Sequence, residues 1–168
     1  MQSGVEFRIR EITRDDIPAL ERMLYLAIHV PEGQEAPLFE IIYQPDLYHY
    51  VENFGQANDL GFAAELNGKV IAAAWARNLA DPELPGYGYV DEATPELSIV
   101  VEPAFRGQGI GTRLLEALHQ ELSQRGVKQI SLSVQKSNPA RKLYERQGYQ
   151  TFEVRGEDLL MVKILGKI

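Results

Sequence analysis

The chain has 168 residues and a net charge of −7, and its first 103 residues carry 18 Asp/Glu against 6 Lys/Arg, a balance that would repel nucleic acid. It has no cysteine, which excludes disulfides, thiolate metal sites and a cysteine nucleophile, and its three histidines lack metal-ligand spacing. No apolar run approaches the roughly 20 residues that cross a membrane, and residues 1–30 do not resemble a signal peptide. We therefore expect one cytoplasmic domain over residues 1–168 that binds neither a metal nor a membrane.

The first quarter of the chain predicts one strand followed by helices. Apolar residues in a strand-like period predict a strand from Phe7 to Ile12, and Thr13 is typical of the residue that caps a helix. Helical spacing of apolar residues then predicts a helix that ends near Ala27. After a proline-bounded break, two short helices are expected, near Leu38 to Tyr43 and near Tyr48 to Phe54.

A β-hairpin and a long loop are expected next. Two apolar runs, at residues 60–66 and 69–77, are joined by Asn67-Gly68, a strong hairpin signal because both turn positions need positive φ. The segment 78–95 that follows contains three prolines and two glycines. Loops of this length tend to be functional or mobile.

A glycine-rich turn then joins a strand to a helix. Strand-like residues Leu97 to Val101 precede Pro103, and the sequence Arg-Gly-Gln-Gly-Ile-Gly-Thr follows at 106–112. Backbone N–H groups of such a turn and of the first helical turn point the same way, and the helix dipole favours negative charge. The pattern predicts a phosphate site to which Arg106 adds a cationic fork. A tight connection without a ligand is the alternative interpretation of the turn on its own.

The turn differs from two better-known phosphate loops. It lacks the Lys-Ser/Thr pair of a P-loop, and its glycines run G-x-G-x-G instead of the dinucleotide fingerprint G-x-G-x-x-G. It also opens a basic part of the chain, because residues 104–148 carry 8 Lys/Arg and 3 Asp/Glu. A basic region suits an anionic ligand.

The rest of the chain completes an α/β fold. The helix after the turn is expected to end at Gly126, and a strand at 127–134 to follow it. Asn138-Pro139 predicts the start of another helix, and 149–154 with 159–164 predict a closing hairpin. The order of elements predicts a single mixed, mostly antiparallel sheet flanked by helices on both faces.

The Arg-Gly-Gln-Gly-Ile-Gly segment resembles the Q/R-x-x-G-x-G/A signature of the GNAT superfamily of acetyl-CoA-dependent N-acetyltransferases. The resemblance covers residues 96–149 well and the remainder by element order only. It implies the GNAT fold and acetyl-CoA as acyl donor. By position it implies that the pantetheine arm pairs with Ile99, Val100 and Val101, and that the pyrophosphate binds at Arg106, Gly107, Gln108, Gly109, Ile110, Gly111 and Thr112.

A second motif strengthens the resemblance. Residues 137–149 are similar to the family segment N-x-x-A-x-x-L-Y-E-x-x-G-F/Y, with one departure: Ala140 lies two residues after Asn138 instead of three. The resemblance implies that Asn138 binds the pantetheine arm and that Tyr144 lies near the thioester sulfur. The alternatives are a helix cap for Asn138 and a core aromatic for Tyr144.

The resemblance implies direct attack of a primary amine on acetyl-CoA in a ternary complex. We expect the Val101 N–H to polarise the thioester carbonyl and Tyr144 to protonate the leaving thiolate as general acid. Glu96, at the start of the cofactor strand, is the expected general base, with a strand-end surface carboxylate as the equal alternative. Ser133 stands where some family members carry a glutamate base, so a water relay is a second route.

The acceptor amine cannot be named from the sequence. The acidic first half would attract a cationic amine, although its charges could equally form solvated faces. Aromatic candidates for the acceptor wall are Tyr43, Trp75, Tyr87 and Tyr89. A non-catalytic acyl-CoA-binding module and a transferase of another acyl group stay open as alternative functions, and so does a homodimer.

Overall fold

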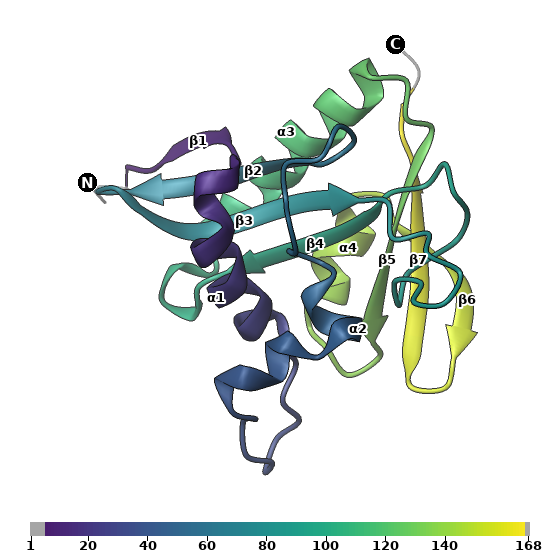
Figure 1. The fold of residues 1–168 in the computed structure, drawn as a ribbon, viewed down its shortest axis with the longest axis horizontal. Coiled ribbons are helices and arrows are strands. Elements are labelled where there is room, and N and C mark those ends of the chain that lie inside the picture. Colours follow the sequence, from purple (N-terminus) through teal and green to yellow (C-terminus); the bar gives the residue numbers. More distant parts are fainter. Residues whose placement is uncertain (1–5, 167–168) are drawn as a thin grey trace.

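The computed structural model describes residues 6–166, which form a seven-stranded sheet in the order β1-β2-β3-β4-β5-β7-β6 (Figure 1). Neighbouring strands are antiparallel except β4 and β5, which are parallel. In chain order the elements are β1 (Arg8–Glu11), the 3₁₀ helix η1 (Arg14–Asp16), α1 (Ile17–Ala27), the 3₁₀ helix η2 (Phe39–Tyr43), α2 (Pro45–Tyr48), β2 (Leu60–Leu66), β3 (Lys69–Arg77), β4 (Glu96–Val101), the 3₁₀ helix η3 (Pro103–Phe105), α3 (Ile110–Gln124), β5 (Gln129–Gln135), α4 (Arg141–Arg146), β6 (Gln150–Arg155) and β7 (Asp158–Ile164).

Helices cover both faces of the sheet, as predicted. In Figure 1, α1 and α2 lie in front of the sheet, whereas α3 and α4 lie behind it. The alanine-rich strand β3 serves both layers: Ala72, Ala74 and Ala76 face the core under α3, while Ala73 and Trp75 face the core under α1. The small side chains of β3 leave room for the leucines of α3, four of which are almost fully buried.

Two predicted helices differ in the structure. No helix spans 48–54 within the described residues: α2 ends at Tyr48, and residues 49–53 form turns. The Arg77 guanidinium accounts for this, because it donates to the carbonyl oxygens of His49 (2.9 Å) and Glu52 (2.7 Å), which a helix would use for its own N–H groups. The other difference is at α4, which begins at Arg141 and not at Pro139. The Asn138 side-chain oxygen accepts from the Ala140 N–H (2.9 Å) and closes a separate turn first.

The feature that positions the site is the divergence of β4 from β5. Among the described residues the two strands pair at one position, Glu96 with Ser131, and beyond it they separate, as Figure 1 shows. The glycine turn and α3 follow β4 at the open end of this gap, and α4 follows β5. Glu96 lies at the closed end.

No helix among residues 6–166 is both long and apolar enough to cross a membrane.

Candidate functional site

The β4–β5 gap is bordered by backbone groups of β4. The Glu102 N–H donates to Ile71 on β3 (2.9 Å), and backbone direction alternates along a strand, so Val100 also turns its peptide groups toward β3. Ile99 and Val101 therefore direct theirs at the gap. Of the three residues expected to hold the pantetheine arm, Ile99 and Val101 direct backbone groups at the gap, whereas Val100 directs its groups at β3.

The glycine turn has the open backbone that anion binding requires. Gly107 (φ +76°) and Gly109 (φ +80°) adopt left-handed conformations, and no described atom lies within 4 Å of a Cβ built on either. Gly111 is different, because a Cβ there would lie 3.3 Å from the Leu143 side chain of α4. Arg106 is exposed, and its Nε donates to the Val101 carbonyl (3.1 Å). This bond ties the guanidinium to the end of β4.

The Glu96 carboxyl is buried, not a surface carboxylate. Only 5% of the residue is exposed, and the Tyr50 hydroxyl donates to its Oε2. Its Oε1 has no hydrogen-bond partner among residues 6–166. Burial raises the pKa of Glu96 to about 7, against the lowering effects of the Tyr50 hydroxyl, the Gly88 backbone and the Arg155 charge. A carboxyl that titrates near neutral pH suits a general base.

The β3–β4 loop covers this carboxyl. A Cβ on Gly86 would overlap Glu96 Oε1, and one on Gly88 would lie 3.0 Å from the Glu96 carboxyl carbon and 2.9 Å from the Leu132 backbone of β5. The Ser131 hydroxyl donates to the Gly88 carbonyl (2.6 Å) and holds the loop against β5. The two glycines are therefore needed for close approach, a function that the sequence pattern did not reveal.

Tyr144 lies on the opposite face of the sheet from Glu96. It packs against the core under α3, with its ring 5.9 Å from that of Tyr149, whereas Glu96 contacts Tyr50 on the α1–α2 face. Burial raises the pKa of Tyr144 to about 12, so its hydroxyl stays protonated at neutral pH. The expected acid and base thus lie on opposite faces of the sheet.

Comparison with known proteins decides the family. The sequence model of the acetyltransferase (GNAT) family matches residues 22–149, well over half of the chain. This chain belongs to the GNAT acetyltransferase family.

Curated relatives within this family act on a ribosomal protein. The ribosomal protein bS18-alanine N-acetyltransferase of Haemophilus ducreyi is 40% identical over 67 residues, 39% of this chain and 46% of that protein. Its counterpart in Escherichia coli K12 is 37% identical over 97 residues, 57% of this chain and 58% of that protein. The chain thus spans about half the length of the curated relatives it matches.

Solved GNAT structures match nearly the whole chain and confirm the predicted fold. PaiA N-acetyltransferase from Thermoplasma acidophilum, in complex with coenzyme A, superposes with a TM-score of 0.67 at 17% identity over 95% of this chain and 99% of that one. The ribosomal-protein-S18-alanine N-acetyltransferase from E. coli gives 0.66 at 25% identity over 97% and 96%. YncA from Salmonella typhimurium, solved with acetyl-CoA, gives 0.68 at 18% identity over 97% and 96%.

In this GNAT chain the segment between α1 and η2 meets the end of β5. His29 Nε2 lies 3.3 Å from the Ser137 hydroxyl, which neighbours Asn138. Sequence reasoning missed this contact, because 108 residues separate the two positions.

Ser133 lies on the same face of β5 as Ser131, since the residues between and beside them point into the core under α3. The position where some family members carry a glutamate base therefore faces the same layer as Glu96.

Four aromatic rings form a row on η2 and its neighbours, of which Phe39 and Tyr43 are exposed and Tyr25 and Tyr48 are partly buried. Ring centroids are 5.4 Å apart for Tyr25 and Phe39, 6.3 Å for Phe39 and Tyr43, and 5.2 Å for Tyr43 and Tyr48. Burial and then the Glu21 carboxylate raise the pKa of both Tyr43 and Tyr48, which places an acid beside the row.

The four aromatic candidates for the acceptor wall divide between surface and core. Tyr43 and Tyr87 are each 52% exposed, and the Tyr87 hydroxyl donates to Asp46 on α2. Tyr89 is partly exposed. Trp75 is 1% exposed and belongs to the core under α1, so it cannot contact an acceptor.

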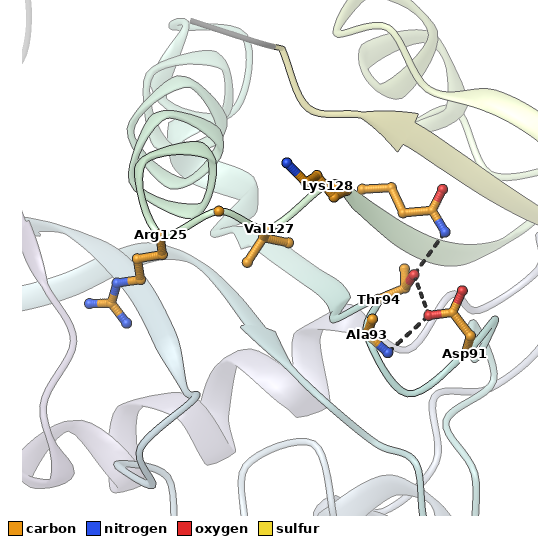
Figure 2. Close-up of a pocket in the computed structure, with 8 residues that line it drawn as sticks. Asp91, Ala93, Thr94, Arg125, Val127 and Lys128 are labelled. Carbon is orange, nitrogen blue, oxygen red and sulfur yellow. Dashed lines mark hydrogen bonds between the residues drawn. The ribbon is translucent and has the colours of Figure 1, made fainter.

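Two pockets on the surface are lined by residues that include neither Glu96 nor the glycine turn. The first, of about 310 Å³, lies between the β3–β4 loop and the α3–β5 connection, beyond the N-terminal ends of β4 and β5 (Figure 2). Its polar groups bond to one another: Asp91 accepts from the Ala93 N–H and the Thr94 hydroxyl, and Gln129 donates to Thr94 (2.8 Å). These bonds fix the chain where it enters β4 and explain the pocket without a ligand. Among residues 6–166 no three acidic or histidine side chains are grouped as metal ligands.

Proposed function

We propose that this GNAT protein transfers an acetyl group from acetyl-CoA to a primary amine within a ternary complex. The observation that carries the proposal is the β4–β5 gap itself. It runs from a glycine turn with open backbone N–H groups to a buried carboxyl whose pKa is near 7. An anion-binding turn, a slot with unpaired strand edges and a base at its end are the parts that transfer from a coenzyme A thioester requires.

The donor would lie along β4. The N–H groups of residues 107–112 and the Arg106 guanidinium would bind the pyrophosphate, because the turn is exposed and open and the helix dipole of α3 favours anions there. The peptide groups of Ile99 and Val101 would pair with the pantetheine arm, and Asn138 would contact it from the other side. The coenzyme A and acetyl-CoA seen in PaiA and YncA support this assignment by fold.

The reaction removes two protons from the ammonium nitrogen, one before and one after its attack, and supplies one proton to the sulfur. Glu96, directly or through a water, would take a proton from the attacking ammonium, and the amine nitrogen would bond to the thioester carbonyl carbon. A β4 N–H directed at the gap, which we expect to be that of Val101, would stabilise the oxyanion. As the C–S bond breaks, Tyr144 would donate its proton to the thiolate, and the second proton of the nitrogen would restore the Tyr144 hydroxyl through water. Removal and delivery take place on opposite faces of the sheet, so both substrates can be bound together.

We infer that the acceptor is cationic and enters from the α1–α2 face. Residues 17–52 contain six Asp/Glu and one Lys/Arg, Arg22, whose guanidinium is bound to Glu102. Exposed aromatic rings stand among these acids, and such rings attract ammonium groups. The curated relatives are named for acetylation of an alanine of ribosomal protein bS18, so peptide amines are the first acceptors to test.

Two measurements test the proposal. Acetyl-CoA should raise the melting temperature of the protein, because a ligand that binds only the folded state stabilises it. Thiol release should then depend on an added amine. Stabilisation by acetyl-CoA without thiol release across a broad amine panel would indicate a non-catalytic acyl-CoA-binding module. Faster release from a longer or acidic acyl-CoA would indicate another acyl group.

A further inference from the structure

We propose that Tyr50 is the positioning residue for Glu96: its hydroxyl holds Oε2 and leaves Oε1 as the oxygen that takes the proton. This inference rests on the proposed function. The two oxygens of the carboxyl are distinguished by their contacts, since Oε2 accepts from Tyr50 and Oε1 is buried without a partner among residues 6–166. A buried carboxylate oxygen without a partner is costly, and an ammonium N–H or a water would supply the missing bond.

Tyr50 is itself held rigidly. It is 8% exposed, and the Trp75 indole N–H donates to its backbone carbonyl (2.9 Å) from the core under α1. The His49 ring packs edge-on against its ring at a centroid distance of 4.7 Å. These contacts involve the backbone and the ring of Tyr50, so a change confined to the hydroxyl leaves them intact.

The direction of the hydrogen bonds is fixed by their partners. The Tyr87 amide N–H, which can only donate, points at the Tyr50 hydroxyl oxygen (2.9 Å). The hydroxyl therefore accepts from the β3–β4 loop and gives its own hydrogen to the Glu96 carboxylate. Tyr50 thus connects the loop that covers Glu96 to one oxygen of the base.

The groups that face Glu96 come from several parts of the chain. They are the Tyr50 hydroxyl, the Gly88 backbone amide of the β3–β4 loop and the Arg155 charge of β6, and all three favour the ionised carboxylate. Burial opposes them and is the larger effect. Tyr50 makes the one side-chain hydrogen bond among these groups, so its removal should raise the pKa of Glu96 further above its present value of about 7.

The test replaces the hydroxyl and measures the carboxyl directly. In Tyr50→Phe, carbon-13 NMR titration of glutamate carboxyls in the free protein should show the Glu96 signal, identified by its loss in Glu96→Gln, with a pKa raised by about 1 to 2. The acidic limb of kcat/KM should move by the same amount, so kcat/KM at pH 7 falls by about fivefold to fiftyfold and recovers at higher pH. KM for acetyl-CoA should not change, because Tyr50 would not contact the donor.

A matched control and a second variant complete the design. Tyr149→Phe removes another buried tyrosine hydroxyl, one bonded to His119, and should leave the pKa of Glu96 unchanged. Replacement of Tyr50 by 3-fluorotyrosine, a stronger donor, should lower the Glu96 pKa and keeps the test decisive if Tyr50→Phe does not fold. An unchanged pKa of Glu96 in either Tyr50 variant would overturn the inference. Because the NMR titration needs no substrate, its result does not depend on whether the protein transfers acetyl groups.

Discussion

The two ends of β4 are built by different physical means. Beyond its C-terminal end, residues 106–109 of the glycine turn are exposed and combine the Arg106 charge with open backbone N–H groups. At its N-terminal end Glu96 is 5% exposed and bound by Tyr50 under a loop that closes over it. The first end depends on contiguous residues, and the second is assembled from segments far apart in the chain.

Because of this difference, we expect the two ends of β4 to have different functions. An open backbone cradle gives affinity for an anion without a titrating group of its own. A desolvated carboxyl binds little but changes protonation near neutral pH. Damage to the turn should therefore reduce donor binding, whereas damage at Glu96 should reduce turnover with donor binding intact.

The largest effect is expected from Glu96→Gln. The amide keeps the shape of the side chain but cannot take a proton, so kcat/KM should fall by about 10²–10⁴-fold while coenzyme A affinity stays unchanged. Thiol release and calorimetry measure the two quantities. Glu102→Gln makes the same change near the other end of β4, where the carboxylate pairs with Arg22 and Lys69, and should retain turnover. Full activity of Glu96→Gln would mean that water takes the proton.

Tyr144→Phe should have the next largest effect. The ring keeps its contact with Tyr149, so stability should change little, but the proton for the thiolate is lost. A thiolate leaves fairly well unaided, so we expect a fall in kcat of about 10²-fold with KM for acetyl-CoA nearly constant. An unchanged kcat, measured where chemistry limits turnover, would make Tyr144 a packing residue.

Gly109→Ala should act on the binding end alone. The new Cβ would enter the space that a phosphate needs, and φ of +80° disfavours any side chain, so coenzyme A affinity should fall by about tenfold or more. Gly33→Ala is the matched control: Gly33 has φ of +83° with equally open surroundings but lies in the α1–η2 segment. Calorimetry compares the two. Equal losses of affinity in both variants would show that backbone strain, and not the cradle, is responsible.

The smallest effect is expected from salt. With acetyl-CoA saturating, kcat/KM for a cationic peptide amine should fall by about threefold to tenfold as salt rises from about 0.05 M to about 0.5 M, because counterions screen the acids of residues 17–52. A peptide of the same length with neutral side chains should respond less. Identical dependence of kcat/KM on salt for the two peptides would show that charge does not contribute to acceptor selection.

Local chemistry made much of the fold predictable. The hairpin of β2 and β3 has the predicted bounds, and both turn residues, Asn67 (φ +51°) and Gly68 (φ +80°), have the positive φ inferred from the dipeptide. The expected helix at 48–54 was wrong, because its carbonyl groups bond to Arg77, a residue that no local pattern connects to it. The roles of Glu96 and Tyr144 stay predictions, although Glu96 lies at the closed end of the gap.

By itself, the sequence determined the parts whose physics is local: the period of the strands, the glycine turn and the start of α3. These need only neighbouring residues, since backbone conformation and helix-end N–H groups are set within a few positions. Tertiary structure alone decided the environment of Glu96. Tyr50 lies 46 residues before it, and of the two glycines that cover it, Gly88 also packs against the backbone of β5. Desolvation sets a carboxyl's pKa, and desolvation depends on everything packed around the group.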